Sequence, residues 1–155
     1  MKLPTILAGP ILRRVDSKNI YLWIALSKPL NIDAQLFYVD STLNKNEYQY
    51  DHIPVHTETK RITLGNCLYI YLLNVTPEST YFPTSVLLGY NLILHEDNQT
   101  KDLGDYDLLN PESENSITYG GLKYPTFFIQ SRNNSRVLYG SCRKPHGKGK
   151  DALVI

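Results

Sequence analysis

The hydrophobic residues of this chain occur in short runs, and each run is bounded by polar residues, prolines or asparagines. Such a series is typical of an all-β fold and differs from the alternation of strands and helices in a parallel α/β fold. No helix of ordinary length is predicted, so every strand needs an antiparallel neighbour. About eight strands are expected, at residues 20–26, 34–39, 48–55, 61–64, 67–73, 86–94, 126–130 and 136–139.

The number and spacing of these strands predict an immunoglobulin- or fibronectin type III-like antiparallel β-sandwich with a short C-terminal extension. Residues 20–26 are apolar on both faces, which predicts a central strand. Residues 73–81 are similar to the corner of fibronectin type III modules, in which a tyrosine hydroxyl, here that of Tyr81, ties two strands together. The periodicity stops between residues 95 and 124, where we expect a long loop with a helical turn at residues 103–109.

Composition and charge exclude several kinds of function. The 155 residues are enough for one domain with a sizeable core. Lys and Arg total 16 against 15 Asp and Glu, so no net field attracts nucleic acid. No apolar stretch approaches the roughly 20 residues of a membrane span, and Pro4 and Pro10 interrupt the only run that resembles a signal peptide. We therefore expect a protein that is cytoplasmic by default, with no membrane span and no nucleic-acid partner.

The densest polar cluster is the glycine-rich, basic segment at residues 140–151 (GSCRKPHGKGKD). Its cations suit a phosphoester, and its glycines let the backbone approach an anion closely. Cys142 stands among these cations, which favour a thiolate that serves as a ligand or nucleophile. Two plainer interpretations stay open, namely a solvated basic tail and an ordinary exposed thiol. The phosphate-binding candidates are Arg143, Lys144, His146 and Lys148.

Other residues give weaker signals. The two cysteines form no zinc-ligand spacing, and Cys67 is expected to be a small core residue because it begins an apolar run. His52 and His56 lie four apart on an expected strand, as two metal ligands would. Without a third ligand nearby, solvated histidines are the preferred interpretation. The aspartates between residues 102 and 107 lack the spacing and the terminal Glu of a calcium loop.

Several segments together resemble the amino-terminal region of PhoD-like metallophosphatases, the alkaline phosphatase D family. The most specific pieces are Gly9-Pro10 with Trp23 near the start and residues 140–147 near the end. The resemblance spans almost the whole chain and is carried by LAGPILRRVDSKNIYLWIAL, LLGYNLIL, YPTFFI and RVLYGSCRKPHGKGKDAL.

This resemblance implies a β-sandwich that precedes a metallophosphatase domain. It also implies that Cys142 is one ligand of a ferric iron that works together with calcium in the full-length family. The other ligands are expected downstream of Ile155. A single thiolate cannot hold a catalytic metal, which needs several ligands and an open position. We therefore expect no cofactor to be bound to this chain.

The sequence thus predicts two parts. Residues 1–132 are expected to form the N-terminal sandwich, and residues 133–155 to be the first strand and metal loop of a truncated metallophosphatase domain. The expected function is that of the N-terminal portion of a PhoD-like alkaline phosphatase or phosphodiesterase, inactive alone. Its partner is the missing C-terminal phosphatase domain, and a phosphoester is the substrate of the full-length protein only. The alternative is a free-standing fibronectin type III-like interaction module without catalysis.

Overall fold

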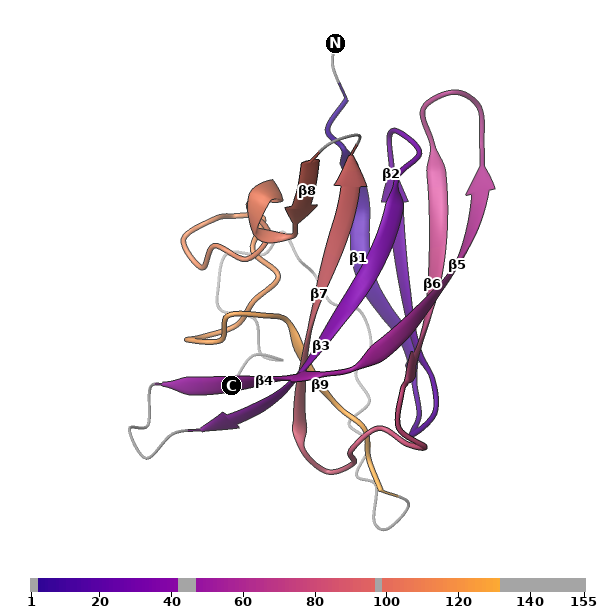
Figure 1. The fold of residues 1–155 in the computed structure, drawn as a ribbon. Coiled ribbons are helices and arrows are strands. Elements are labelled where there is room, and N and C mark those ends of the chain that lie inside the picture. Colours follow the sequence, from indigo (N-terminus) through magenta and orange to yellow (C-terminus); the bar gives the residue numbers. More distant parts are fainter. Residues whose placement is uncertain (1–2, 42–46, 97–98, 132–155) are drawn as a thin grey trace, which may run out of the picture.

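The computed structural model describes residues 3–41, 47–96 and 99–131 (Figure 1). These residues form nine strands and one short 3-10 helix, η1 (Gly104–Tyr106). All strand pairs are antiparallel. The strands are β1 (Ile6–Val15), β2 (Ile20–Leu26), β3 (Asn31–Ser41), β4 (Tyr48–Ile53), β5 (Val55–Thr63), β6 (Tyr69–Pro77), β7 (Leu87–Glu96), β8 (Gln99–Asp102) and β9 (Thr126–Phe128).

The strands belong to two sheets that share one hydrophobic core. The first sheet has the order β1-β2-β6-β5, and the second has the order β4-β3-β7-β8, with β9 paired to the beginning of β7. Alternate residues of β2, β3, β6 and β7 point inward, as expected for strands that are half buried. They include Ile20, Leu22, Ile24, Ile32, Leu36, Leu73, Val75, Leu88, Leu92 and Leu94. The expected all-β fold of antiparallel strands is therefore confirmed, and its arrangement is sandwich-like.

Most of the expected strands are present, and residues 20–26 form a central strand between β1 and β6 as predicted. The strand expected at residues 136–139 lies outside the described residues. Two strands were not predicted, β1 and β8. Prolines interrupt the apolar run near the start, and no strand was expected there. Strand β1 is an edge strand with register shifts between Ile6 and Arg14, and such irregular edges tolerate proline.

Gly9 and Trp23, which both belong to the resemblance described above, are in contact through the backbone of Trp23. Gly9 has a φ of +88° and lies where a Cβ atom would be only 2.9 Å from the backbone oxygen of Trp23. A glycine is therefore needed here for two reasons, the positive φ and the close approach of β1 to β2. Gly9 therefore allows the first two strands to approach each other closely at the backbone of Trp23.

The chain passes from the second sheet to the first at Pro54, between β4 and β5. Strand β4 pairs with β3 up to Ile53, and β5 pairs with β6 from Val55 onward. The expected short strand at residues 61–64 is therefore the end of a longer strand, β5. Its polar sequence, VHTETKRIT, concealed it, because an edge strand has few fully buried positions.

The connection between β6 and β7 differs from the expected tyrosine corner. Tyr81 is 53% exposed, and the Nζ of Lys18 lies 5.5 Å from the centre of its ring. The neighbouring Phe82 is buried instead, and its backbone N–H donates a hydrogen bond of 2.7 Å to the carbonyl oxygen of Ser17. The prediction for Tyr81 is therefore wrong, and Phe82 anchors this connection to the β1–β2 turn.

The expected loop between residues 95 and 124 contains β8 and the turn η1. The predicted helical turn is confirmed as η1, which follows the fully buried Leu103. The buried side chain of Asn91 holds this region in place. Its Nδ2 donates to Asp102, and its Oδ1 accepts the backbone N–H groups of Leu92 and Leu103. The amide is satisfied by these bonds, as a buried polar group requires.

Tyr90 on β7 makes the fold sensitive to alkaline pH. It is 5% exposed, and burial raises its pKa to about 12. Since the unfolded phenol ionises near pH 10, the folded state loses stability as the pH rises from about 10 to about 12. We expect the free energy of unfolding to fall by about 1 kcal/mol more in the wild type than in Tyr90→Phe between pH 8 and pH 11. Urea titrations at both pH values measure the difference, and equal losses would contradict the assignment.

Candidate functional site

The crossing of the chain at Pro54 opens a groove between β3 and β5. Strand β4 pairs only with residues 36–41 of β3, so residues 31–35 have β7 on one side and no strand of their own sheet on the other. Strand β5 belongs to the first sheet but runs beside this open edge. A stretch of β3 backbone therefore faces the side chains of the other sheet.

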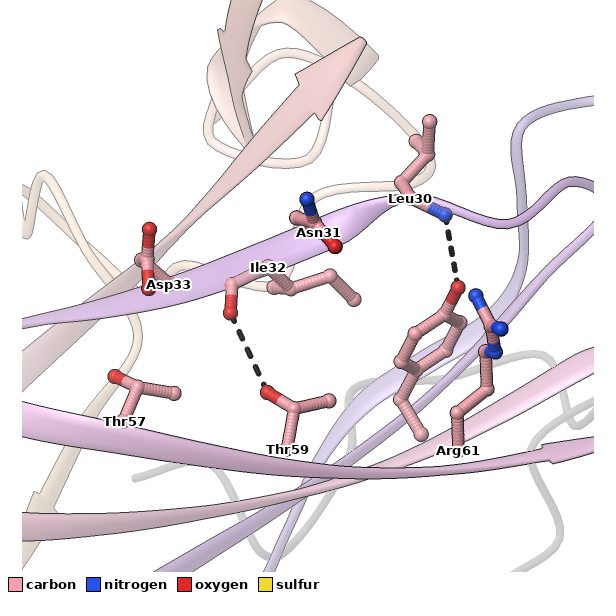
Figure 2. A pocket seen from close by; sticks show the side chains of 8 residues that line it. Leu30, Asn31, Ile32, Asp33, Thr57, Thr59 and Arg61 are labelled. Carbon is pink, nitrogen blue, oxygen red and sulfur yellow. Dashed lines mark hydrogen bonds between the residues drawn. The ribbon is translucent and has the colours of Figure 1, made fainter.

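Hydroxyl groups from the first sheet satisfy part of the open backbone edge of β3. The N–H of Ala34 donates to Thr57 Oγ1 at 3.1 Å, and Thr59 Oγ1 donates to the carbonyl oxygen of Ile32 at 3.5 Å. The N–H of Leu30, just before β3, donates to the hydroxyl of the buried Tyr71 at 2.8 Å. Figure 2 shows the last two bonds crossing from one sheet to the other. These bonds replace a strand ladder and hold the sheets together along the groove.

The groove is open to solvent and has a volume of about 530 Å³. This volume falls within the range of roughly 300–1,000 Å³ that is common for small-molecule sites. Residues 30–33 form one wall, and alternate residues of β5 form the other, with Tyr71 of β6 beside them. The β5 residues are Thr57, Thr59 and Arg61, which share one face because side chains alternate along a strand.

The charges of the groove lie at its two ends (Figure 2). Asp33 is at one end, where its Oδ2 lies 2.7 Å from Nε2 of His95 on β7. Arg61 is at the other end, and within the described part of the chain its guanidinium makes no ion pair or hydrogen bond. The groove therefore has one carboxylate with a partner and one cation without one.

The chemistry of the lining residues suits binding rather than catalysis. The hydroxyls of Thr57 and Thr59 are hydrogen-bonded to the backbone of β3 and not to a carboxylate or an imidazole base, so neither is activated as a nucleophile. The lining offers a guanidinium, hydroxyl groups and backbone edge groups, which all form hydrogen bonds to a ligand. A polar cavity with few charged groups can hold a small ligand and orient it.

The predicted metal and phosphate residues lie outside the described residues. This applies to Cys142, Arg143, Lys144, His146 and Lys148 alike. Among residues 3–41, 47–96 and 99–131, no group of three or more His, Cys, Asp or Glu side chains is placed to hold a metal ion. The described part of the chain and the basic segment are therefore separate candidates for function.

The other residues considered from the sequence have structural or solvent-facing positions. His52 and His56 are exposed on either side of Pro54, and the ring of His52 lies 5.9 Å from that of Phe37. The expectation for Cys67 is wrong, because it is exposed in the turn between β5 and β6. Strand β6 begins two residues later, at Tyr69, which leaves Cys67 outside the apolar part of the run.

The aspartates near η1 cap the backbone. Asp102 Oδ1 accepts the N–H groups of Gly104 and Asp105, and Asp105 Oδ2 accepts the N–H of Asp102. Asp107 accepts hydrogen bonds from Ser113 and Asn110. Both bonds lower the pKa of its carboxyl group, the one from Ser113 more strongly. These carboxylates are engaged in shaping a turn, a common use of aspartate outside regular structure.

A second surface feature lies on the outer face of the first sheet. Trp23 of β2 is half-buried there and pairs with Leu72 of β6, which is 37% exposed. Ile11 of β1, at 45% exposure, and Ile62 of β5, at 60%, extend the apolar face toward both edges of the sheet. We call these four residues the outer apolar face. Exposed apolar residues that adjoin one another are a common feature of interaction surfaces.

Sequence reasoning missed both the groove and the outer apolar face. The signal for the groove was the alternation of Thr57, Thr59 and Arg61, which places them on one face of a strand. The signal for the outer face was weaker, because Leu72 and Trp23 lie in runs that are apolar on both sides. Such runs do not reveal which side meets the core.

Comparisons with known proteins give no relative. No protein-family model, no curated protein and no solved structure matches the chain. No helix among the described residues is long and apolar enough to cross a membrane.

Proposed function

We propose that the described residues are the N-terminal sandwich of a PhoD-like metallophosphatase, and that the 155-residue chain by itself does not hydrolyse phosphoesters. The observation that carries the proposal is the strand order. The order β1-β2-β6-β5 against β4-β3-β7-β8 is similar to the immunoglobulin-type order A-B-E-D against C′-C-F-G, with β9 also paired to β7 at its other end. This is the kind of sandwich that the resemblance implies before the catalytic domain.

The contact between Gly9 and Trp23 gives further support. Gly9 is among the most specific pieces of the resemblance, and the backbone oxygen of Trp23 leaves no room for a side chain there. The packing of β1 on β2 therefore requires a glycine at this position. Because the contact is to the backbone, it explains Gly9 and not the choice of tryptophan at residue 23.

In this proposal the chemistry belongs to the full-length protein. Cys142 provides one ligand to iron, with calcium nearby, and Arg143, Lys144, His146 and Lys148 contact the phosphoester. The described residues add no cluster of metal-binding side chains to that set. Since several ligands are needed for a catalytic metal, the sandwich alone is a packing partner of the phosphatase domain and not a catalyst.

Phosphoesterase assays test this function. With p-nitrophenyl phosphate and bis(p-nitrophenyl) phosphate, in the presence of Fe³⁺ and Ca²⁺, we expect the 155-residue chain to give no turnover above the blank. The chain extended by the reading frame downstream of Ile155 is expected to be active, and Cys142→Ala is expected to abolish that activity. Turnover by the 155-residue chain that Cys142→Ala removes would contradict the proposal.

The second candidate is a free-standing interaction module of the fibronectin type III kind. The outer apolar face favours it, because a face with exposed Ile11, Ile62 and Leu72 is suited to contact another protein surface. The assay on the extended chain also distinguishes the two candidate functions. If the downstream frame encodes no further metal ligands and the extended protein is inactive, the module is favoured.

A further inference from the structure

Arg61 and Tyr71 place two unused hydrogen-bond donors at one end of the groove. The Tyr71 hydroxyl is on a residue that is 1% exposed, and it accepts the N–H of Leu30 at 2.8 Å. Its own proton has no acceptor among the described residues. Arg61 is opposite Tyr71 in the register of β5 and β6, so the two side chains lie on the same face, and among the described residues the guanidinium has no partner. Both groups are thus free to donate to the same ligand.

A buried hydroxyl proton without an acceptor is unfavourable, and a ligand oxygen removes that cost. A guanidinium on an exposed strand is usually only solvated, which would make Arg61 unremarkable by itself. Here it stands at a cavity of about 530 Å³ whose wall contains the Tyr71 hydroxyl. The two donors converge on a common space, so an acceptor-rich, negatively charged group is the ligand chemistry that fits them.

The shape and charge of the groove favour a carboxylate over a phosphate. A guanidinium binds a planar carboxylate through two parallel hydrogen bonds. Asp33 lines the other end of the groove, three residues along β3 from Leu30, which is about 10 Å in a strand. Its charge repels a phosphate dianion about twice as strongly as a carboxylate monoanion. The cavity is also larger than a lone carboxylate, so it has room for an organic body.

We propose that the groove between β3 and β5 binds small organic molecules through a carboxylate group, held by the Arg61 guanidinium and the Tyr71 hydroxyl. None of the lining residues belongs to the basic segment at residues 140–151, and the site does not depend on the phosphatase proposal. The Leu30 N–H already bonds to the same hydroxyl, so it orients the tyrosine and leaves its proton for the ligand.

The binding test uses the 155-residue chain labelled with ¹⁵N and titrated with sodium butyrate at pH 7.5. We expect saturable shifts of the amide signals of Leu30 and Ile32, which lie beside the two donors. Sodium chloride at equal ionic strength is expected to give no saturable shift, and inorganic phosphate is expected to bind at least several-fold more weakly. Tighter binding of phosphate, or no saturable shift with butyrate, would overturn the proposal.

Two neighbouring substitutions locate the site. Arg61→Gln is expected to weaken butyrate binding by at least about tenfold, because it removes a charge-assisted hydrogen bond to the carboxylate. Lys60→Gln removes the same charge from the adjacent residue, whose side chain points to the opposite face of β5. It is expected to change the affinity less than twofold. Equal effects of the two substitutions, or none from Arg61→Gln, would show that the groove is not the site.

Discussion

Replacing Leu73 by alanine is expected to lower the free energy of unfolding by about 3 kcal/mol. Leu73 is fully buried on the central strand β6, where it pairs with Leu22 of β2, which is also fully buried. Its side chain belongs to the core that both sheets share. The substitution therefore removes apolar contacts from the middle of the sandwich-like fold and leaves a cavity that packed neighbours fill only in part.

The neighbouring Leu72 provides the matched control. It is the same residue type on the same strand, but it points outward and is 37% exposed. Leu72→Ala changes the strand preference by the same amount and removes much less buried surface, so the expected loss is below about 1 kcal/mol. Urea unfolding followed by circular dichroism gives both values. Similar losses for the two variants would mean that the assignment of inner and outer faces is wrong.

The central strands could be predicted from the hydrophobic pattern of their sequences. Residues 20–26 are apolar, and strand β2 lies between β1 and β6 with its inner face in the core. The predicted strand at residues 34–39 lies within β3, and the one at residues 86–94 begins one residue before β7. In all three strands the inward-facing positions are apolar, and that pattern is a sufficient guide.

The edge strands were harder to predict for a physical reason. Strand β1 contains Pro10 and Gly9, which usually mark a break but are tolerated on an edge with irregular pairing. Strand β5 has mostly exposed residues, since one side faces solvent and the other faces the groove. Its charged and threonine residues therefore lack the apolar signal of a core strand. Edge strands of this kind commonly carry charges, which discourage pairing with other chains.

The groove could not be predicted from the sequence because it depends on how the two sheets meet. Leu30, Thr57 and Tyr71 are distant in sequence, and only the crossing at Pro54 brings them together. Sequence patterns indicate which residues share a face of one strand, but not which strands of opposite sheets lie side by side. The residues expected from the resemblance at positions 142–148 are a separate matter, since they lie outside the described residues.

Gly9→Ala is expected to lower the free energy of unfolding by about 2–4 kcal/mol, from two effects that add. The φ of +88° disfavours any residue with a Cβ atom by about 1–2 kcal/mol. The new Cβ would also lie 2.9 Å from the oxygen of Trp23 and 3.3 Å from the Cα of Ile24. Both are backbone atoms of β2, so a rotamer change cannot relieve the overlap, and β1 has to move away from β2.

Gly65→Ala isolates the first effect from the second. Gly65 has a φ of +68°, and a Cβ there would meet no atom within 4 Å. Its expected loss is therefore only the conformational part, about 1 kcal/mol. Urea unfolding of both variants measures the difference, and the fluorescence of Trp23, the single tryptophan, is expected to change in Gly9→Ala alone. Equal losses of stability in the two variants would mean that the close approach at Gly9 does not hold β1 and β2 together. The Gly9–Trp23 contact would then no longer support the proposed family.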